Sequence, residues 1–235
     1  EWRMKLICVL LTLVSMPAFA LTLTTEELPP FNFVKDGNVV GQSTDVMREV
    51  LKRTGIPGTI SVYPWKQAYQ MAQEGKDTCV YSTSRTEARE SLFKWVGPLA
   101  TNTWTLYAKA SNPLPIIRSL DDAKKYSVGT YQSDAKAVFL KENNFKTDDS
   151  AMNDEQVIRK LDDGKIDLWL ASSGISRRIA RSAKIGIKPV FVVREINMFA
   201  ACNLAVPDQD IARMNDAVKA IKYDGTFDKI LNLYY

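Results

Sequence analysis

The sequence of 235 residues contains no histidine. This absence excludes serine–histidine triads and histidine general bases, and it removes the commonest side-chain ligand for zinc. Cysteine is nearly as scarce, because only Cys8, Cys79 and Cys202 are present, too far apart for a metal site by spacing. We therefore expect no metal, no other cofactor and no catalytic residues.

Long apolar runs are also missing, with one short exception near the N-terminus. The run from Leu6 to Met16 follows two basic residues and precedes the small-x-small tripeptide Ala18-Phe19-Ala20. Eleven apolar residues are too few to cross a bilayer, which needs about 20. The pattern is typical of a cleaved signal peptide, here residues 1–20, and predicts a periplasmic protein.

The remaining chain lacks a strong charge of either sign. Without residues 1–20 it has 29 basic and 26 acidic residues, a net charge of +3 that is spread evenly. Such a balance does not indicate a nucleic-acid partner. Export would permit a disulfide between Cys79 and Cys202, but both lie in apolar segments where buried thiols fit equally well.

The chain does contain alternating strand-like and helix-like segments, which indicate α/β architecture. Strands are expected at 21–25, 59–63, 78–82, 104–109, 126–130, 166–171, 189–193 and 198–206. Helices are expected from a Ser43 cap to Gly55, from Pro64 to Gly75, after Thr86, near Ser133-Asp134, from Asn153 to Gly164, from Ser172, at about 208–222 and at 226–234.

Four motifs in order carry a resemblance to a known family. They are Leu28-Pro29-Pro30-Phe31 with Gly41 and Asp45, Ser82–Arg89 followed by Phe93–Pro98, Leu161–Asp167, and Tyr223–Ile230. Over residues 21–235 the sequence resembles the extracellular solute-binding proteins, family 3, typified by polar amino-acid receptors of ABC importers.

The resemblance implies a type II periplasmic-binding-protein fold, with two α/β lobes, two crossing strands and a ligand cleft between the lobes. Lobe 1 would comprise residues 21–99 and 198–235, and lobe 2 residues 100–197. It also implies a monomeric receptor, not an enzyme, that closes around a small polar, carboxylate-bearing solute and delivers it to ABC-importer membrane subunits.

The resemblance implies that Arg89 binds the ligand carboxylate, with help from Ser82 and Ser84. A planar guanidinium can donate two parallel charge-assisted hydrogen bonds to a carboxylate. By spacing alone, Arg89 would instead be an exposed helical arginine. Trp65 matches a position that forms an aromatic wall of the site, although helical spacing would also place it in the core. Phe31 is expected to support the site from the core.

One departure bears on ligand class. Amino-acid receptors of the family carry an aspartate after the second-lobe strand, where it pairs with the ligand ammonium; here that position is Ser172. Asp134 either caps the second-lobe helix or replaces the missing charge, and Glu26 and Glu27 are further acidic candidates. We therefore expect a carboxylated ligand that lacks a free α-amine.

Two other functions stay open. The same fold occurs in dehydratases of cyclic acids, for which Glu27 or Asp134 could act as acid or base. Alternatively, the closed form could signal to a separate membrane receptor.

Overall fold

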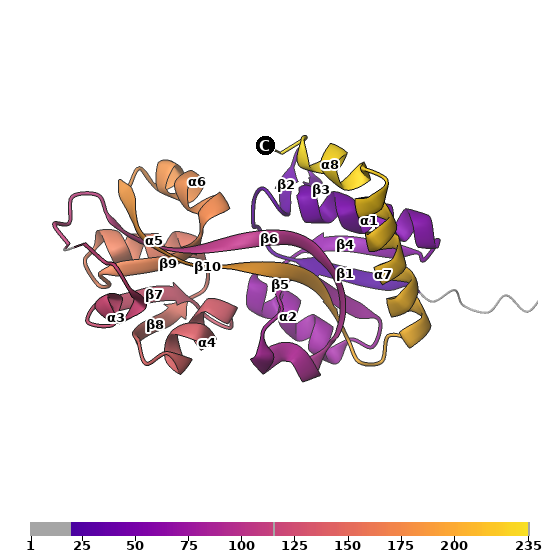
Figure 1. Ribbon diagram of the computed structural model, residues 1–235, viewed down its shortest axis with the longest axis horizontal. Helices are drawn as coiled ribbons and strands as arrows, with labels where there is room; N and C mark the ends of the chain where they lie inside the picture. The colour runs from indigo at the N-terminus through magenta and orange to yellow at the C-terminus, as the bar shows by residue number, and fades with distance from the viewer. Residues whose placement is uncertain (1–19, 115, 235) are drawn as a thin grey trace, which may run out of the picture.

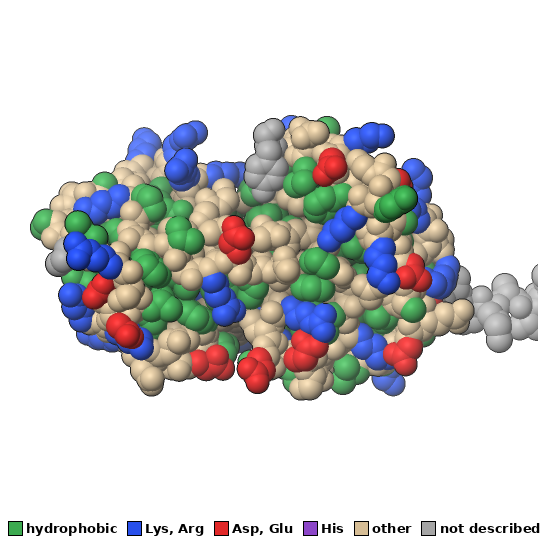
Figure 2. Space-filling model, in the orientation of Figure 1, with side chains coloured by type: hydrophobic (Ala, Val, Ile, Leu, Met, Phe, Trp, Pro, Cys, Tyr) green, Lys and Arg blue, Asp and Glu red, His purple; other side chains and the backbone are tan. Residues whose placement is uncertain are grey.

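The computed structural model describes residues 20–114 and 116–234, so the predicted signal peptide lies outside this range except for Ala20. The ribbon forms two lobes linked by the strands β6 (Lys94–Lys109) and β10 (Ile187–Cys202) (Figure 1). Within the described residues, no helix is long and apolar enough to cross a membrane. Basic and acidic side chains are interspersed over the face shown in Figure 2.

The other strands are β1 (Leu21–Thr25), β2 (Phe33–Lys35), β3 (Asn38–Val40), β4 (Gly58–Val62), β5 (Thr78–Ser84), β7 (Ser127–Tyr131), β8 (Lys146–Ala151) and β9 (Leu168–Ser172). The helices are α1 (Gln42–Thr54), α2 (Trp65–Glu74), the 3₁₀ helix η1 (Glu87–Leu92), α3 (Leu120–Ala123), α4 (Ala135–Glu142), α5 (Asp154–Asp162), α6 (Ser173–Ala183), α7 (Asp208–Tyr223) and α8 (Thr226–Leu231).

One eight-stranded sheet passes through both lobes in the order β4-β1-β5-β10-β6-β9-β7-β8. In lobe 1, β1 is parallel to β4 and β5; in lobe 2, β7 is parallel to β8 and β9. The two crossing strands are antiparallel to each other. The predicted α/β fold with two crossing strands is therefore confirmed. The lobe boundaries, at 21–99 with 198–235 and at 100–197, remain our proposal.

The crossing strands differ from the sequence prediction. Two separate strands were expected at 189–193 and 198–206, but β10 is continuous from Ile187 to Cys202. The polar residues Glu195 and Asn197 break its apolar pattern, yet they pair with Thr103 and Thr101 of β6. Backbone hydrogen bonds to β6 thus keep this segment in a strand, although its side-chain pattern alone predicts a loop.

The start of α1 also differs, because Ser43 does not cap it. The cap is Gly41, with φ 124°, and the N–H groups of Gln42 and Ser43 donate to the carbonyls of Pro30 and Phe31. A side chain on Gly41 would overlap the Phe31 carbonyl. The loop that carries the first motif therefore caps α1 with its own backbone, and this contact requires glycine.

Cys79 and Cys202 form a disulfide. Of the two alternatives that the sequence left open, a disulfide or two buried thiols, the structure therefore has the disulfide. Both residues are fully buried in lobe 1. The bond joins β5 to the end of β10, and it therefore fixes one end of a crossing strand in the lobe 1 core.

Candidate ligand-binding site

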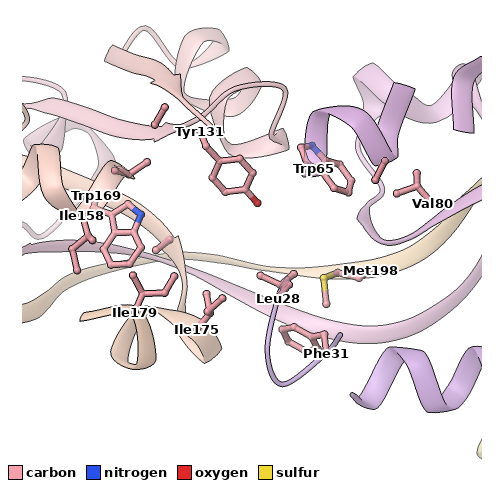
Figure 3. Packing of buried hydrophobic residues seen from close by; sticks show 14 of the residues in the cluster. Leu28, Phe31, Trp65, Val80, Tyr131, Ile158, Trp169, Ile175, Ile179 and Met198 are labelled. Atoms are coloured by element: carbon pink, nitrogen blue, oxygen red, sulfur yellow. The ribbon is translucent and has the colours of Figure 1, made fainter. Parts of the chain in front are cut away.

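Side chains of both lobes enclose a small pocket of about 10 Å³, no more space than one water occupies. Six of the predicted site residues line it: Trp65, Ser82, Ser84, Arg89, Asp134 and Ser172. Glu27 lines a larger cavity beside it. Phe31 lines neither space; it is 3% exposed and packs in the core next to Leu28 and Met198 (Figure 3).

Arg89 lies on η1 and is buried, with 5% of its surface exposed. Its guanidinium stacks on Trp65 and Tyr69, 5.4 and 4.9 Å from the ring centroids. Its nitrogens donate to the carbonyls of Ser133 (2.9 Å) and Ser84 (3.3 Å). In the described part of the chain, none of the ion pairs includes Arg89. The prediction from spacing, an exposed helical arginine, is therefore wrong, and this buried cation forms no ion pair within residues 20–114 and 116–234.

Ser82 takes part in a network that holds the first loop. It has a left-handed backbone (φ 59°), and its hydroxyl donates to the side-chain oxygen of Asn32. The Asn32 amide in turn donates to the Glu26 carbonyl. Because the Ser82 proton is committed to Asn32, its oxygen is available to the pocket mainly as an acceptor.

Trp65 is both a core residue and a wall of the pocket, the two alternatives that the sequence left open. It is 4% exposed and packs in the largest core cluster, yet it also lines the small pocket and the larger cavity. Its indole nitrogen donates to the Ser133 carbonyl of the other lobe at 2.9 Å. Trp65 therefore bridges the lobes at the edge of the pocket.

Asp134 caps α4, as the first of the two alternatives predicted. Its Oδ1 accepts from the Lys136 backbone at 2.6 Å, and its Oδ2 pairs with the Lys136 ammonium at 3.0 Å. Burial raises the pKa of Asp134, but the Lys136 charge together with hydrogen bonds from the Lys136 backbone and Tyr131 holds the pKa below its ordinary value. The charge of Asp134 is thus already compensated. Sequence reasoning missed Lys136 because lysine is rarely buried.

Ser172 lies at the end of β9 and is 1% exposed. Its hydroxyl accepts a 2.8 Å hydrogen bond from Asn102, a residue of β6 that sequence reasoning missed. The other side-chain atom of Asn102, Oδ1, is buried without a hydrogen-bond partner among the described residues, and both side chains line the pocket. Lobe 2 therefore presents neutral acceptors where the resemblance implies an aspartate.

The larger cavity lies beside the small pocket, between the lobes, and has a volume of about 430 Å³. The two spaces share Glu26, Trp65 and Tyr131. In Figure 3 the Tyr131 hydroxyl points from lobe 2 toward the Trp65 side of the gap. This volume is within the range of small-molecule sites, about 300–1,000 Å³.

Two carboxyl groups in this cavity have strongly shifted pKa values. Glu26 accepts from the Tyr131 hydroxyl at 3.0 Å, and burial, reinforced by the Asp134 carboxylate, raises its pKa to about 8. Asp154 accepts from the Trp169 indole at 2.9 Å, and burial raises its pKa to about 6. Groups with such shifts, in a cleft, often mark functional sites. Within the described residues no cluster has the composition of a metal site.

The family model described as bacterial extracellular solute-binding proteins, family 3, matches residues 21–235. No curated protein matches the sequence.

Similar solved structures show the same type II periplasmic-binding fold. A histidine kinase sensor domain with similarity to periplasmic binding proteins has a TM-score of 0.82 at 15% identity, covering 92% of this chain and 95% of that one. An ancestral arginine-binding protein bound to arginine has a TM-score of 0.77 at 22% identity, covering 92% and 98%. The substrate binding protein of an amino acid ABC transporter has a TM-score of 0.76 at 18% identity, covering 92% and 99%.

Proposed function

The chain belongs to family 3 of the bacterial extracellular solute-binding proteins, and from this premise we propose that it is a periplasmic receptor for a small carboxylate-bearing solute, amino-acid-like or a derivative. We further propose that it acts as a monomer and delivers the solute to the membrane subunits of an ABC importer. The similarity to the substrate binding protein of an amino acid ABC transporter supports this role.

The observation that carries the proposal is the state of Arg89. Its guanidinium is buried at the pocket, yet its polar partners are two backbone carbonyls rather than a carboxylate. A buried cation that is unpaired is costly, and a ligand carboxylate would supply two charge-assisted hydrogen bonds in its place. Lys136, on the opposite wall, is compensated by Asp134, so Arg89 is the cation left for the ligand.

We propose binding without catalysis. The carboxylates considered for acid–base chemistry have other roles, because Asp134 caps α4 and pairs with Lys136. Glu27 is exposed and accepts from the Val34 backbone at 2.9 Å. Neither arrangement prepares a proton for transfer to a bound acid.

A sensory role is the second candidate. The similarity to a histidine kinase sensor domain favours it, although at 15% identity that similarity shows the fold alone. In that case the liganded protein would signal through a separate membrane receptor.

The ligand itself provides the test. The protein should be purified from the periplasm without unfolding, denatured, and its released small molecules identified by mass spectrometry and then titrated back. We expect a compound with a carboxylate that rebinds in a 1:1 ratio. Release and rebinding of a compound without any acidic group would contradict the proposal.

A further inference from the structure

The side chain of Glu26 reaches from lobe 1 to lobe 2. Glu26 follows β1, and the Asn32 amide donates to its backbone carbonyl, which holds the base of the side chain in lobe 1. Its carboxyl group accepts a hydrogen bond from the Tyr131 hydroxyl of lobe 2 at 3.0 Å. The side chain lines both the small pocket and the larger cavity. The Glu26 carboxyl is therefore part of the junction between the lobes, and it loses this environment when they separate.

The lobe 2 side of the junction is rich in buried charge. Tyr131 ends β7, Asp134 caps α4, Lys136 lies in the first turn of α4, and Asp154 begins α5. The three charged side chains are 3–6% exposed, and all of them act on Glu26. Lys136 contacts Asp134 directly, at 3.0 Å, and it acts on the other two carboxyl groups from farther away.

The remaining groups around this carboxyl add little buried charge. Glu27, Tyr63 and Glu155 line the larger cavity, but the two glutamates are exposed and keep their water. The part of α6 that lines the cavity is apolar, with Ile175 and Ile179. The charge of the junction is therefore set by its buried groups.

These buried groups include one acid more than they include bases. Two cations, Lys136 and Arg89, face three carboxyl groups, those of Glu26, Asp134 and Asp154. A charge removed from water is costly unless an opposite charge compensates it, so the junction is balanced when one carboxyl group is neutral. That group is Glu26, because burial, reinforced by both aspartates, outweighs the Lys136 charge and raises the pKa of Glu26 to about 8.

We propose that Glu26 is a pH-sensitive latch between the lobes, which takes up a proton when the lobes close and releases it when they open. In the open arrangement the carboxyl group faces water and has left the aspartates of lobe 2, so it ionises in the ordinary way. Mild acid therefore favours the closed protein, and mild alkali favours the open one. The inference goes beyond solute capture, because it holds for the protein without a ligand.

Proton linkage gives the direction and the size of the effect. Between the ordinary pKa of 4.5 and the value of about 8 at the junction, the closed protein holds a proton that the open protein has released. Each rise of one pH unit in this range lowers the equilibrium constant for closing by at most about tenfold. Burial raises the pKa of Asp154 to about 6, so this second group contributes mainly below that pH.

Small-angle scattering of the ligand-free protein, from about pH 6.5 to 8.5 at constant ionic strength, tests the latch. We expect the radius of gyration of the parent to increase with pH. Glu26→Gln has the shape of the protonated carboxyl group and can still accept from Tyr131, so its radius should stay at the low-pH value of the parent throughout. Glu27→Gln, which neutralises the exposed neighbour, is the matched control and should follow the parent.

Asp154→Asn tests the charge balance itself. The new amide can still accept from the Trp169 indole, but the junction has lost one negative charge. Glu26 should then ionise more readily in the closed protein, and the change in radius should move to lower pH. Circular dichroism must show that each variant is folded over the whole range.

The outcomes are distinct from those for solute capture. A radius that does not change with pH in the parent, a parent that becomes more compact as pH rises, or a pH dependence that survives in Glu26→Gln overturns the latch. Carboxylate capture by Arg89 would stand in each of these cases, because it does not require a proton on Glu26.

Discussion

Trp65 donates its indole N–H to the Ser133 carbonyl 2.9 Å away, and this hydrogen bond joins α2 of lobe 1 to the segment before α4 of lobe 2. Arg89 donates to the same carbonyl. One backbone oxygen of lobe 2 therefore accepts hydrogen bonds from two of the lobe 1 side chains that line the pocket. The contacts that hold the two lobes together in this arrangement are therefore made by residues of the pocket itself.

Trp65→Phe should weaken closure, because phenylalanine keeps an aromatic wall but cannot donate to Ser133. Small-angle scattering should show a larger radius of gyration for the apo variant than for the apo parent, and ligand should compact both. Trp95→Phe is the matched control, since its indole donates to the Glu90 carbonyl within lobe 1. Identical radii with and without saturating ligand would identify a rigid module and refute hinge closure.

Arg89→Ala should abolish the thermal stabilisation that the released acid gives to the parent protein. Loss of a buried charge-assisted pair costs on the order of 2–5 kcal/mol of binding. Arg85→Ala is the control, because Arg85 is nearby but pairs with Glu90 at the surface. Differential scanning fluorimetry and titration calorimetry measure both effects. Binding by Arg89→Ala within threefold of the parent would remove Arg89 from the site.

The raised pKa of Glu26 predicts a pH dependence of stability. Asp134, Lys136, Asp154 and Tyr131 surround this carboxyl, and burial raises its pKa from 4.5 to about 8. Between these values the folded protein binds a proton that the unfolded chain has released, so the free energy of unfolding decreases as pH rises from about 5 to 8.

Glu26→Gln should reduce this slope, because glutamine does not titrate. In the apo protein, the fall of the melting temperature between pH 5 and 8 should be smaller in the variant by at least about 2–4 °C, the shift that 1 kcal/mol produces in a chain of this size. Glu27→Gln serves as the control from the same loop. Parallel melting curves of Glu26→Gln and parent over pH 5–8 would show that Glu26 titrates normally.

Reduction of the Cys79–Cys202 bond should destabilise lobe 1. The bond closes a loop with a sequence separation of 123 residues, and loss of a disulfide of this kind costs about 2–5 kcal/mol. The melting temperature of the parent should fall when reductant is added. The double variant Cys79→Ala/Cys202→Ala should melt at the lower temperature with or without reductant. A parent insensitive to reductant after complete thiol release would contradict this expectation.

Much of the fold was predictable because local pattern and tertiary structure agree. The strand at 21–25 and the stop of α1 at Gly55 follow directly from alternation and from a left-handed glycine cap. The continuity of β10 was not predictable, since polar residues at the crossing are held by pairing with a strand distant in sequence. The alternation of apolar and polar residues indicates which side chains are buried. Glu195 and Asn197 are paired through their backbones but are exposed, so the alternation does not reveal them as strand residues.

The site was predictable only in part, for a related reason. Arg89 stands in a recognisable motif, but Asn102, Lys136 and Asp154 have no local signal that separates them from ordinary polar residues. Their roles arise from burial at the junction of two lobes, which no short segment encodes. The charge balance at the site therefore had to come from the structure.

The last prediction concerns the α-amine of the ligand and rests on Ser172. An α-ammonium beside a bound carboxylate needs a negative partner, because an unpaired buried charge costs several kcal/mol. Asp134, one of the rescues that the sequence left open, is paired with Lys136 at 3.0 Å. Asn102 and Ser172 supply only neutral acceptors. We therefore expect carboxylated ligands that lack the α-amine to bind more tightly than the amino acids with the same carbon skeleton.

Ser172→Asp should reverse this preference. The new carboxylate would lie at the end of β9, where it can still accept from the Asn102 amide and can pair with an α-ammonium in the small pocket. Affinity for unmodified amino acids should rise at least tenfold, while the matching acids without an α-amine, which have no group for the new charge, should gain nothing. Ser172→Asn introduces a side chain of similar shape to aspartate without its charge, and it should favour neither the amino acid nor the acid that lacks the α-amine. Because Ser172 is buried, each variant must first show a cooperative melting transition close to that of the parent. If a well-folded Ser172→Asp protein gains no affinity for any amino acid, or if the parent already binds an amino acid as tightly as the matching des-amino acid, lobe 2 does not select against the α-amine through this position.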